Sequence, residues 1–444
     1  MLDIKIIREH AEEVKQNIIN RKASADIDGI LELDEKRKNL QIEVDGLRQQ
    51  LNSGSKQKPT PEEIQRLRGL STQISSKENE LKHVQQSLNE KLSWVPNILA
   101  ADVPLGESEE DNIEIKAWTK DGYLSEDKLG KKDTSRSWMP KFDFFAKDHI
   151  DLGKKLDIID VEQSAKVSGT RFAYVKNEGF LLEYALFELL KNKLIEEGFT
   201  PMIVPLLVKN KALFGSSHFP EEVDQVYKIE SKNVEEGEEL YLIGSSEPSL
   251  FSYFMDKTIP EEELPKKVFA FTPCFRSEVG SWGKDVRGIK RVHQFDKLEM
   301  DTVTSADKSD ETQQYLLSLN EWLLQQLKIP YHIILMCSAD SGYAAAYRKY
   351  DVEAWLPSQQ TFMEVMSDTN ATDFQARRLN IKYQTQTGDK KYVHTVNDTG
   401  VAMGRMIIAI LDNYQRADGS VKVPEALQKY VGKEILTHEK KPRS

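Results

Sequence analysis

Residues 267–301 read KVFAFTPCFRSEVGSWGKDVRGIKRVHQFDKLEMD, and this stretch holds the strongest indication of the fold. Its two ends, 267–277 and 291–301, are rich in aromatic and branched apolar residues, as strands are. The connection at 279–290 holds three glycines together with lysine and arginine. The pattern predicts a pair of neighbouring strands joined by a mobile, cationic loop.

The two predicted strands have one charged face each, because side chains alternate across a strand. Arg276 and Glu278 share a face on the first strand. The shared face of the second strand consists of Arg291, His293, Phe295, Lys297 and Glu299. The opposite face has Val292, Leu298 and Met300, which are typical of a packed surface. Arginines, carboxylates and an aromatic ring therefore predict a site for a charged, flat ligand, and solvated charges on an exposed sheet are the weaker alternative.

A second cluster, VNDTGVAMGR at 396–405, runs from a predicted strand into a helix. Gly400 and Gly404 permit a close approach of the backbone. Arg405 lies on a helix that is otherwise apolar, so it needs an anionic partner. A phosphate suits an arginine in this position, and a buried structural salt bridge is the alternative.

Two further segments place carboxylates among apolar residues. Glu364 lies within the strand-like stretch 362–367, where it must be paired, bound to a metal or at the strand's edge. Regular alternation puts Glu364 and Ser367 on opposite faces, so their cooperation requires the strand to bulge or end near Met366. The stretch LIGSSEP at 242–248 could hold an ammonium group with its hydroxyls and carboxylate, although such a sequence before a helix is usually only a cap.

Familiar phosphate and metal motifs are missing from the sequence. It contains no Gly-rich phosphate loop of the Walker or dinucleotide type and no HExxH zinc motif. Phosphate binding is therefore expected to depend on arginines on a sheet.

The first hundred residues predict a helical hairpin. Apolar residues recur at heptad spacing over 30–51 and again over 64–88, with Arg37 and Lys77 in seam positions. Between them, 52–59 cannot continue a helix, whereas Thr60, Pro61 and Glu63 predict an N-cap, a first turn and a capping box. Arms of this length reach about 40–50 Å. Few other apolar residues are present, which favours a protruding arm over a pair packed on the body or a dimerising coiled coil.

The rest of the chain has the mixed pattern of strands and helices that is typical of an α+β protein. After an acidic stretch at 107–114, strand-like runs are expected at 240–244, 267–277, 291–301, 331–336, 361–367 and 391–396. Helices are expected at 181–197, 247–256, 309–327, 371–379 and 401–415. Adjacent strands without helices between them predict a mainly antiparallel sheet flanked by helices. The expected domains are an arm at 1–110, a linker and catalytic-domain start at 111–170, and a catalytic domain at 171–444.

Composition limits the location and partners of the protein. The 61 Lys and Arg against 72 Asp and Glu give a net charge of −11, which argues against indiscriminate nucleic-acid coating. Residues 1–93 are balanced, with 16 basic and 16 acidic side chains, and the stretch 48–68 is locally basic. Two cysteines, no signal peptide and no long apolar segment predict a reduced, cytoplasmic protein that does not enter a membrane.

These clusters, in this order, resemble the motifs of class II aminoacyl-tRNA synthetases, and the hairpin narrows the resemblance to seryl-tRNA synthetases. The resemblance covers nearly the whole chain: the opening MLDIKIIRE, the Pro205 strand, FRSE with RVHQFDKLE, DFQARR, and GVAMGR with the following helix. It implies that serine and ATP form seryl-adenylate and that serine then passes to the 3′ end of tRNA(Ser), with tRNA(Sec) as an open further substrate. It also implies Mg²⁺ and a homodimer.

The resemblance also implies site residues. Arg276 and Arg405 are the expected catalytic residues. The expected ATP-binding residues are Arg276, Ser277, Glu278, Arg291, Phe295, Glu364, Val365, Met366, Ser367 and Arg405, of which Glu364 and Ser367 would hold Mg²⁺. The expected serine-binding residues are Ser245, Ser246, Glu247, Arg276, Glu299, Asn397 and Thr399. The basic tip of the arm suggests Arg48, Lys56, Lys58, Arg66 and Arg68 for tRNA.

Three positions depart from the family pattern. Ser245 replaces the threonine of a Thr-x-Glu loop, Asp398-Thr399 replaces Gly-Ser, and Asp368 replaces a cysteine. The first two changes preserve hydrogen bonding and are expected to affect affinity rather than activity. Two alternatives remain. One is a ligase that charges a carrier protein or another amino acid, against which the complete hairpin argues, because a carrier-protein ligase has no need of a tRNA arm. The other is a non-catalytic paralogue, in which loss of the motif arginines or of Glu364 would be expected.

Overall fold

The computed structural model describes residues 1–54, 60–130, 136, 139–230, 235, 237–279 and 287–438. The chain divides into two compact units, Met1–Ile98 and Leu99–Ser444. The first domain was expected to end at residue 110, whereas the first compact unit ends at Ile98. Residues 113–119, within the stretch 111–170 expected as linker and catalytic-domain start, form a strand of the main sheet of the second unit.

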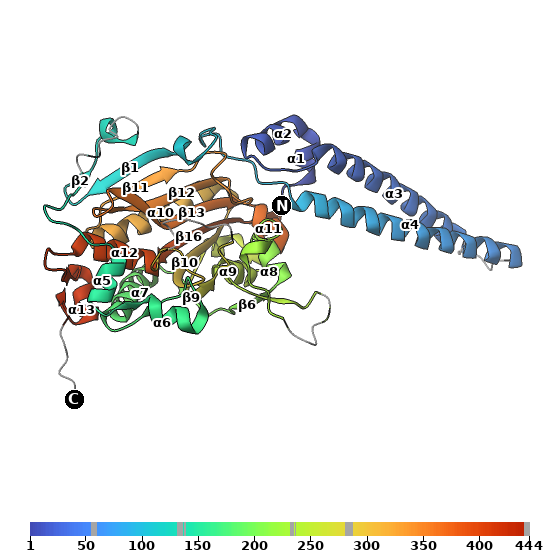
Figure 1. The fold of residues 1–444 in the computed structure, drawn as a ribbon. Coiled ribbons are helices and arrows are strands. Elements are labelled where there is room, and N and C mark those ends of the chain that lie inside the picture. The colour runs from blue at the N-terminus through green and yellow to red at the C-terminus, as the bar shows by residue number, and fades with distance from the viewer. Residues whose placement is uncertain are drawn as a thin grey trace. The chain divides into compact units, whose positions relative to one another are not determined.

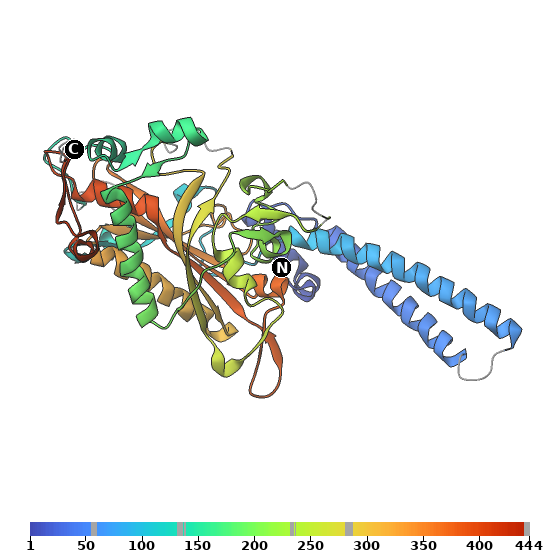
Figure 2. The same ribbon diagram turned by 90° about the horizontal axis from the view of Figure 1, so that it is seen from below.

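The first unit is helical. Short helices α1 (Ile4–Glu9) and α2 (Ala11–Asn20) precede the long helices α3 (Ile27–Gly54) and α4 (Pro61–Ser93). Figure 2 shows α3 and α4 side by side along most of their length. At the start of α4 the Thr60 hydroxyl accepts a hydrogen bond from the Glu63 amide, and the Glu63 carboxylate accepts one from the Thr60 amide at 2.7 Å. This confirms the predicted capping box.

The hairpin is apolar at its base and increasingly polar toward its tip. Its base packs on α1 and α2 through the buried residues Leu2, Ile7, Val14, Ile18, Ile27, Ile30, Leu88, Leu92 and Val95. Farther out, the predicted seam interruption Lys77 pairs with Glu43 of the other helix at 2.8 Å. Ile64, near the tip, is 41% exposed. Apolar packing fixes the base, and farther out buried seam residues such as Val44 and Ile74 act together with ion pairs across the seam.

The second unit is built on a nine-stranded sheet (Figure 1). In spatial order its strands are β2 (Gly122–Tyr123), β1 (Ile113–Thr119), β11 (Tyr331–Leu335), β12 (Arg348–Leu356), β13 (Thr361–Thr372), β16 (His394–Ala402), β10 (Gln294–Thr304), β9 (Lys266–Phe275) and β5 (Thr200–Pro201). Every neighbouring pair is antiparallel except β5 and β9. The predicted fold class is confirmed.

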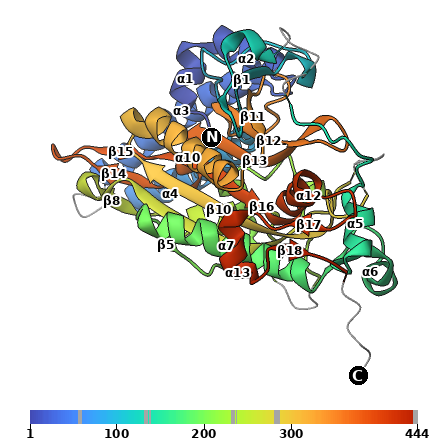
Figure 3. The ribbon, with the colours of Figure 1, turned by 90° about the vertical axis from the view of Figure 1, so that its left-hand side faces the viewer.

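One face of the sheet carries the main core. Helices α7 (Glu178–Glu196), α10 (Ser309–Gln326) and α12 (Met403–Tyr414) supply buried apolar side chains to it (Figure 3). Leu298 and Met300 of β10 are fully buried in this core, as their parity predicts. The alternate residues Lys297 and Glu299 line a cavity. Because the helices cover the apolar face, the other face of the central strands is left for polar side chains.

Smaller elements surround that other face. They include α8 (Asn210–Gly215), β7 (Leu240–Leu242), α9 (Glu247–Ser252) and α11 (Phe374–Leu379). Helix α5 (His149–Lys155) instead contacts α12 and buries Leu152 in the main core. Among the described residues, no helix has both the length and the apolar character that crossing a membrane requires.

Candidate active site

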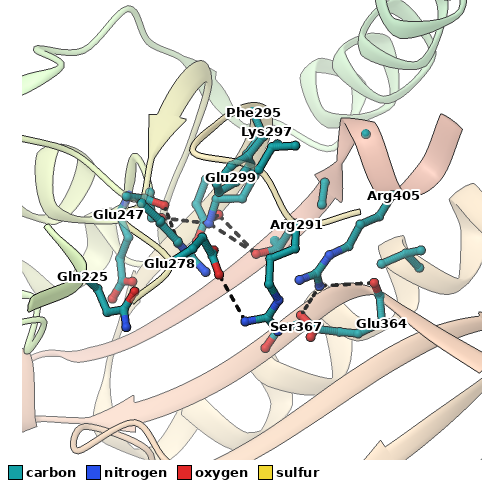
Figure 4. Close-up of a pocket in the computed structure, with 18 of the residues that line it drawn as sticks. Gln225, Glu247, Glu278, Arg291, Phe295, Lys297, Glu299, Glu364, Ser367 and Arg405 are labelled. Carbon is teal, nitrogen blue, oxygen red and sulfur yellow. Dashed lines mark hydrogen bonds and ion pairs between the residues drawn. The ribbon is translucent and has the colours of Figure 1, made fainter. Parts of the chain in front are cut away.

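A cavity of about 410 Å³ lies over the polar face of the sheet, and Figure 4 shows the side chains that line it. Strands β10, β13 and β16 contribute residues to its wall, as do the segment that follows β9, the start of α9 and the start of α12. Charged and polar side chains predominate in the lining. The cavity therefore suits a ligand that carries charges of both signs.

Three arginines reach the cavity. Arg291 Nη1 lies 3.1 Å from Glu278 Oε2, and Arg405 Nη1 lies 3.0 Å from Glu364 Oε1. Arg276 Nε donates to the Gly244 carbonyl at 3.2 Å, and its guanidinium carbon lies 5.4 Å from the centre of the Phe295 ring. These contacts orient three cations around one space, which is the arrangement that a polyphosphate requires.

Glu364 and Ser367 both line the cavity, although regular alternation would separate them. In the pairing of β12 with β13, Val352 faces Met366 but the next residue, Glu353, faces Glu364. Val365 is therefore an extra residue, and this bulge brings Glu364 and Ser367 to the same side. The bulge that was expected to bring these two residues together is therefore confirmed. Burial raises the pKa of Glu364, but Arg405 and Lys349 outweigh burial and hold it below its usual value.

A second group of polar residues surrounds Lys297. Its ammonium lies 2.5 Å from Glu299 Oε2 and donates to the Ser245 hydroxyl at 2.8 Å. The Thr399 hydroxyl donates to Glu299 at 3.4 Å. Lys297 and Glu299 are 4% and 2% exposed, respectively. This end of the cavity is therefore small, polar and almost closed.

Glu247 is held by one oxygen only. Its Oε1 accepts hydrogen bonds from the Tyr343 hydroxyl at 2.8 Å, from Gln375 Nε2 at 2.7 Å and from Asn397 Nδ2 at 3.1 Å. Within the described residues no hydrogen bond engages Oε2, which leaves this oxygen for a ligand. Burial and the Glu299 carboxylate raise the pKa of Glu247 to about 8. A bound ammonium would offset both effects and stabilise the carboxylate.

The cavity brings together most of the residues expected from the sequence. Those that line it are Ser245, Glu247, Arg276, Glu278, Arg291, Phe295, Glu299, Glu364, Val365, Ser367, Asn397, Thr399 and Arg405. Three expected residues lie outside the lining. Ser277 donates to the Asp224 carbonyl, Met366 is buried in the main core, and Ser246 is buried with its hydroxyl unpaired.

The structure differs from regular alternation just before β10. This strand begins at Gln294, so the parity expected from residue 291 does not hold there. Val292 lines the cavity, whereas His293 bonds to the Arg276 carbonyl and to Tyr227. Part of the expected cationic loop, 280–286, lies outside the described residues. Gly404 permits the predicted close approach, but its neighbour is the Ile289 carbonyl of the chain itself.

Several residues of the site were missed by sequence reasoning. Lys297 was placed on the correct face but given no role, and Gln375 lies in the recognised DFQARR segment. Tyr343, Lys290 and Lys349 also line the cavity. Tyr343 lies in a loop, where the sequence has no periodicity from which the direction of a side chain could be predicted.

The residues expected to bind tRNA lie on the arm. Arg48 pairs with Glu78 across the hairpin at 2.7 Å, and Arg66 and Arg68 are exposed on α4. Lys56 and Lys58 fall outside the described residues. The described basic residues are thus on the surface, where a polyanion can reach them.

Known proteins resemble both units. The family described as seryl-tRNA synthetase N-terminal domain matches residues 1–99, and the family described as tRNA synthetase class II core domain (G, H, P, S and T) matches residues 227–414. A serine–tRNA ligase of Dictyoglomus turgidum is 40% identical over 97% of this chain and 98% of its own length. One from Pyrococcus horikoshii is 39% identical over 100% of this chain and 99% of its own length.

Solved structures show the same similarity. The seryl-tRNA synthetase of Pyrococcus horikoshii complexed with ATP superposes with a TM-score of 0.87 at 36% identity, covering 98% of this chain and 99% of that one. The cytoplasmic serine–tRNA ligase of Naegleria fowleri in complex with AMP gives 0.82 at 28% identity with the same coverage. From its N-terminal helices to its antiparallel core, the chain belongs to the seryl-tRNA synthetase family.

Proposed function

We propose that this protein is an ATP-dependent serine–tRNA ligase. The observation that carries the proposal is the position of Arg276. It contacts Gly244, beside the Ser245–Glu247 segment, and the ring of Phe295 on its other side. An arginine at this junction can touch both an amino-acid carboxylate held near Glu247 and the α-phosphate of a nucleotide whose base lies on Phe295.

Catalysis of the first step depends more on orienting the two substrates than on activating the nucleophile. The serine carboxylate is already a nucleophile, so it attacks the α-phosphorus and pyrophosphate leaves with its bonding electrons. Arg276 neutralises charge at the reacting phosphate, while Arg291 and Arg405 receive the departing phosphates. Glu278 faces the adenine amino group. In the second step the terminal ribose hydroxyl of tRNA(Ser) attacks the seryl carbonyl and AMP leaves.

The serine end of the cavity explains amino-acid choice. Glu247 Oε2 takes the ammonium group, and the polar atoms of Glu299 and Thr399 take the hydroxyl. Asn397 fixes Glu247, and Ser245 is fixed by Lys297. Alanine would leave these buried groups unpaired, so discrimination of about 10⁴-fold is expected.

Mg²⁺ fits the phosphate end of the cavity. Glu364 and Ser367 offer hard oxygen donors on one wall. In the part of the chain that the structure describes, no group of three or more His, Cys, Asp or Glu side chains could hold an ion alone. Magnesium commonly takes one or two protein oxygens and completes its shell with phosphates and water. When bound, it would supply further neutralisation of phosphate charge.

A homodimer in the cytoplasm is the expected form. On α7, Phe180, Leu181, Tyr184 and Ile195 are all more than one-third exposed, and Ile203 after β5 is fully exposed. Apolar residues gathered in this way are typical of an interface. Sedimentation should give about twice the chain mass of 50.9 kDa. Cys274 and Cys337 are buried free thiols, which supports a reducing compartment.

The test of the function is pyrophosphate exchange into ATP, measured with serine, threonine, alanine and glycine. Exchange that depends on serine, followed by charging of tRNA(Ser), is the expected result. Charging of a tRNA(Sec) transcript would be measured beside it. Folded protein that shows no exchange with serine would contradict the proposal and favour a non-catalytic paralogue.

The affinity for serine is expected to depend on pH. Because the pKa of Glu247 is raised to about 8, the free site is protonated at pH 6 and must lose this proton to bind an ammonium group. The KM for serine should therefore fall by up to about tenfold per unit as the pH rises from 6 to 8. Glu247→Gln should have a high KM without this slope. A KM for serine that is constant over this range in the unaltered protein would contradict the assignment.

A further inference from the structure

Gly288, Ile289 and Lys290 form a short segment that leads into the phosphate end of the cavity. Ile289, Lys290 and Arg291 all line the cavity, and Ile289 also packs into the main core. The position of both cations therefore depends on how the backbone of this segment is held. No strand includes it, since β10 begins only at Gln294.

His149 contacts this backbone from one side. It is the first residue of α5 and is 7% exposed. Its Nε2 accepts a hydrogen bond from the Ile289 amide at 3.3 Å. A Cβ placed on Gly288 would come within 1.9 Å of the same nitrogen, and Gly288 has a φ of +65°. The imidazole thus lies directly against the main chain, in space that only glycine leaves open.

Helix α12 also contacts the segment. A Cβ on Gly404 would lie 3.0 Å from the Ile289 carbonyl oxygen, which shows how closely the two backbones approach. Arg405 Nε donates to the Lys290 carbonyl at 3.4 Å. The backbone of the segment is therefore held both by His149 and by the start of the helix that bears Arg405.

The hydrogen bond to Ile289 requires a neutral histidine. A ring nitrogen accepts only when it carries a lone pair, so the proton of the neutral ring lies on Nδ1. Burial, opposed by Asp148 and assisted by Lys290, lowers the pKa of His149 to about 4. Within the described residues, Nδ1 has no hydrogen-bond partner. Among the described residues, the hydrogen bond from the Ile289 amide is thus the one hydrogen bond of the His149 ring.

We propose that His149 is a positioning residue for ATP: its Nε2 holds the Ile289 backbone so that Lys290 and Arg291 face the phosphates. The proposal rests on the proposed function. Its alternative is a histidine that only fills the core. The two differ in outcome, because a core residue affects stability alone, whereas a positioning residue also affects ATP affinity.

The test compares His149→Leu with His149→Gln. Leucine fills space but cannot accept, whereas the glutamine side-chain oxygen can reach the place of Nε2. In pyrophosphate exchange, the leucine variant should raise the KM for ATP by about tenfold, the cost of leaving a buried amide unpaired. Glutamine should restore most of this loss. The KM for serine should stay within about twofold in both variants, because the serine end is formed by other elements.

A second readout does not depend on activity. Hydrogen exchange of the Ile289 amide should be faster in the leucine variant than in the glutamine variant, and calorimetry should show weaker ATP binding. His394→Leu is the matched control: it loses a partly buried hydrogen bond to Ser309 in the same unit, and His394 does not line the cavity. It should lower the melting temperature but leave the KM for ATP unchanged.

The outcomes separate the two proposals. Equal KM values for ATP in the leucine and glutamine variants, with the Ile289 amide still protected, would overturn the role of His149. A wild-type protein that binds ATP yet shows no exchange would instead overturn the ligase assignment. The calorimetry and hydrogen-exchange comparisons would then still test His149.

Discussion

Replacing Arg276 by alanine is expected to lower the rate of serine-dependent pyrophosphate exchange by about 10²–10³-fold, the usual effect of removing one preorganised charge donor. Arg276 directly follows β9 and is oriented by the Gly244 carbonyl and the Phe295 ring. Arg291 and Arg405 are each paired with a carboxylate. In the described part of the chain no such ion pair engages Arg276, so its charge is available to a ligand.

The loss should appear mainly in kcat, because charge develops at the α-phosphate in the transition state. Arg276→Lys retains the charge but loses the planar Nε–H that bonds to Gly244, so an intermediate rate is expected. Arg416→Ala, at an exposed turn outside the cavity, is the control and should behave as wild type. A loss of less than about tenfold in folded Arg276→Ala would remove Arg276 from its central role.

Local patterns predicted the elements whose structure depends on near neighbours. The capping box at Thr60 and the helices of the hairpin follow from spacing alone, and the observed helix begins at Pro61. Strands β1 and β12 were missed. Strand β12, RKYDVEAWL, mixes charges with apolar residues, because several of its polar side chains find partners only in the folded sheet. The order of the nine strands depends on contacts between distant segments, which no periodicity encodes.

In the site, too, features that follow from local spacing could be predicted, whereas contacts between distant segments could not. Alternation along β10 placed Phe295, Lys297 and Glu299 on one face, and the cavity contains all three. It failed at Val292, since the strand had not yet begun. The contacts of Glu247 with Tyr343 and Gln375 join residues about a hundred positions apart. Their roles could not be predicted from spacing, because a loop and a short helix supply them.

Shortening the arm is expected to separate the two steps of the reaction. Replacing residues 41–80 by a short Gly-Ser turn should leave serine-dependent pyrophosphate exchange within about twofold of wild type, because every residue that lines the cavity lies beyond position 98. The kcat/KM for charging tRNA(Ser) should fall by about 100-fold or more, since the phosphate contacts that position the tRNA are lost.

The cut is chosen from the packing of the hairpin. Ile30, Leu88 and Leu92 belong to the core that α1 and α2 share with its base, so they remain. Asp34, which pairs with Arg8 and Arg37, also remains. The removed part is held by seam residues such as Val44 and Ile74 and by ion pairs such as Glu43 with Lys77, none of which belongs to that core. A larger deletion would expose the apolar core of the first unit and confuse loss of binding with loss of folding.

A charge-reversed arm of full length provides the matched comparison. Arg66→Glu with Arg68→Glu keeps the hairpin, since both side chains are exposed on α4. If phosphate contacts at the tip carry the binding, this variant should weaken tRNA binding and reduce its salt dependence, because fewer counterions are released. If only the shape of the arm matters, the truncation alone would impair charging. A truncated protein that loses exchange as well as charging would contradict the separation, because the cavity would then depend on the arm.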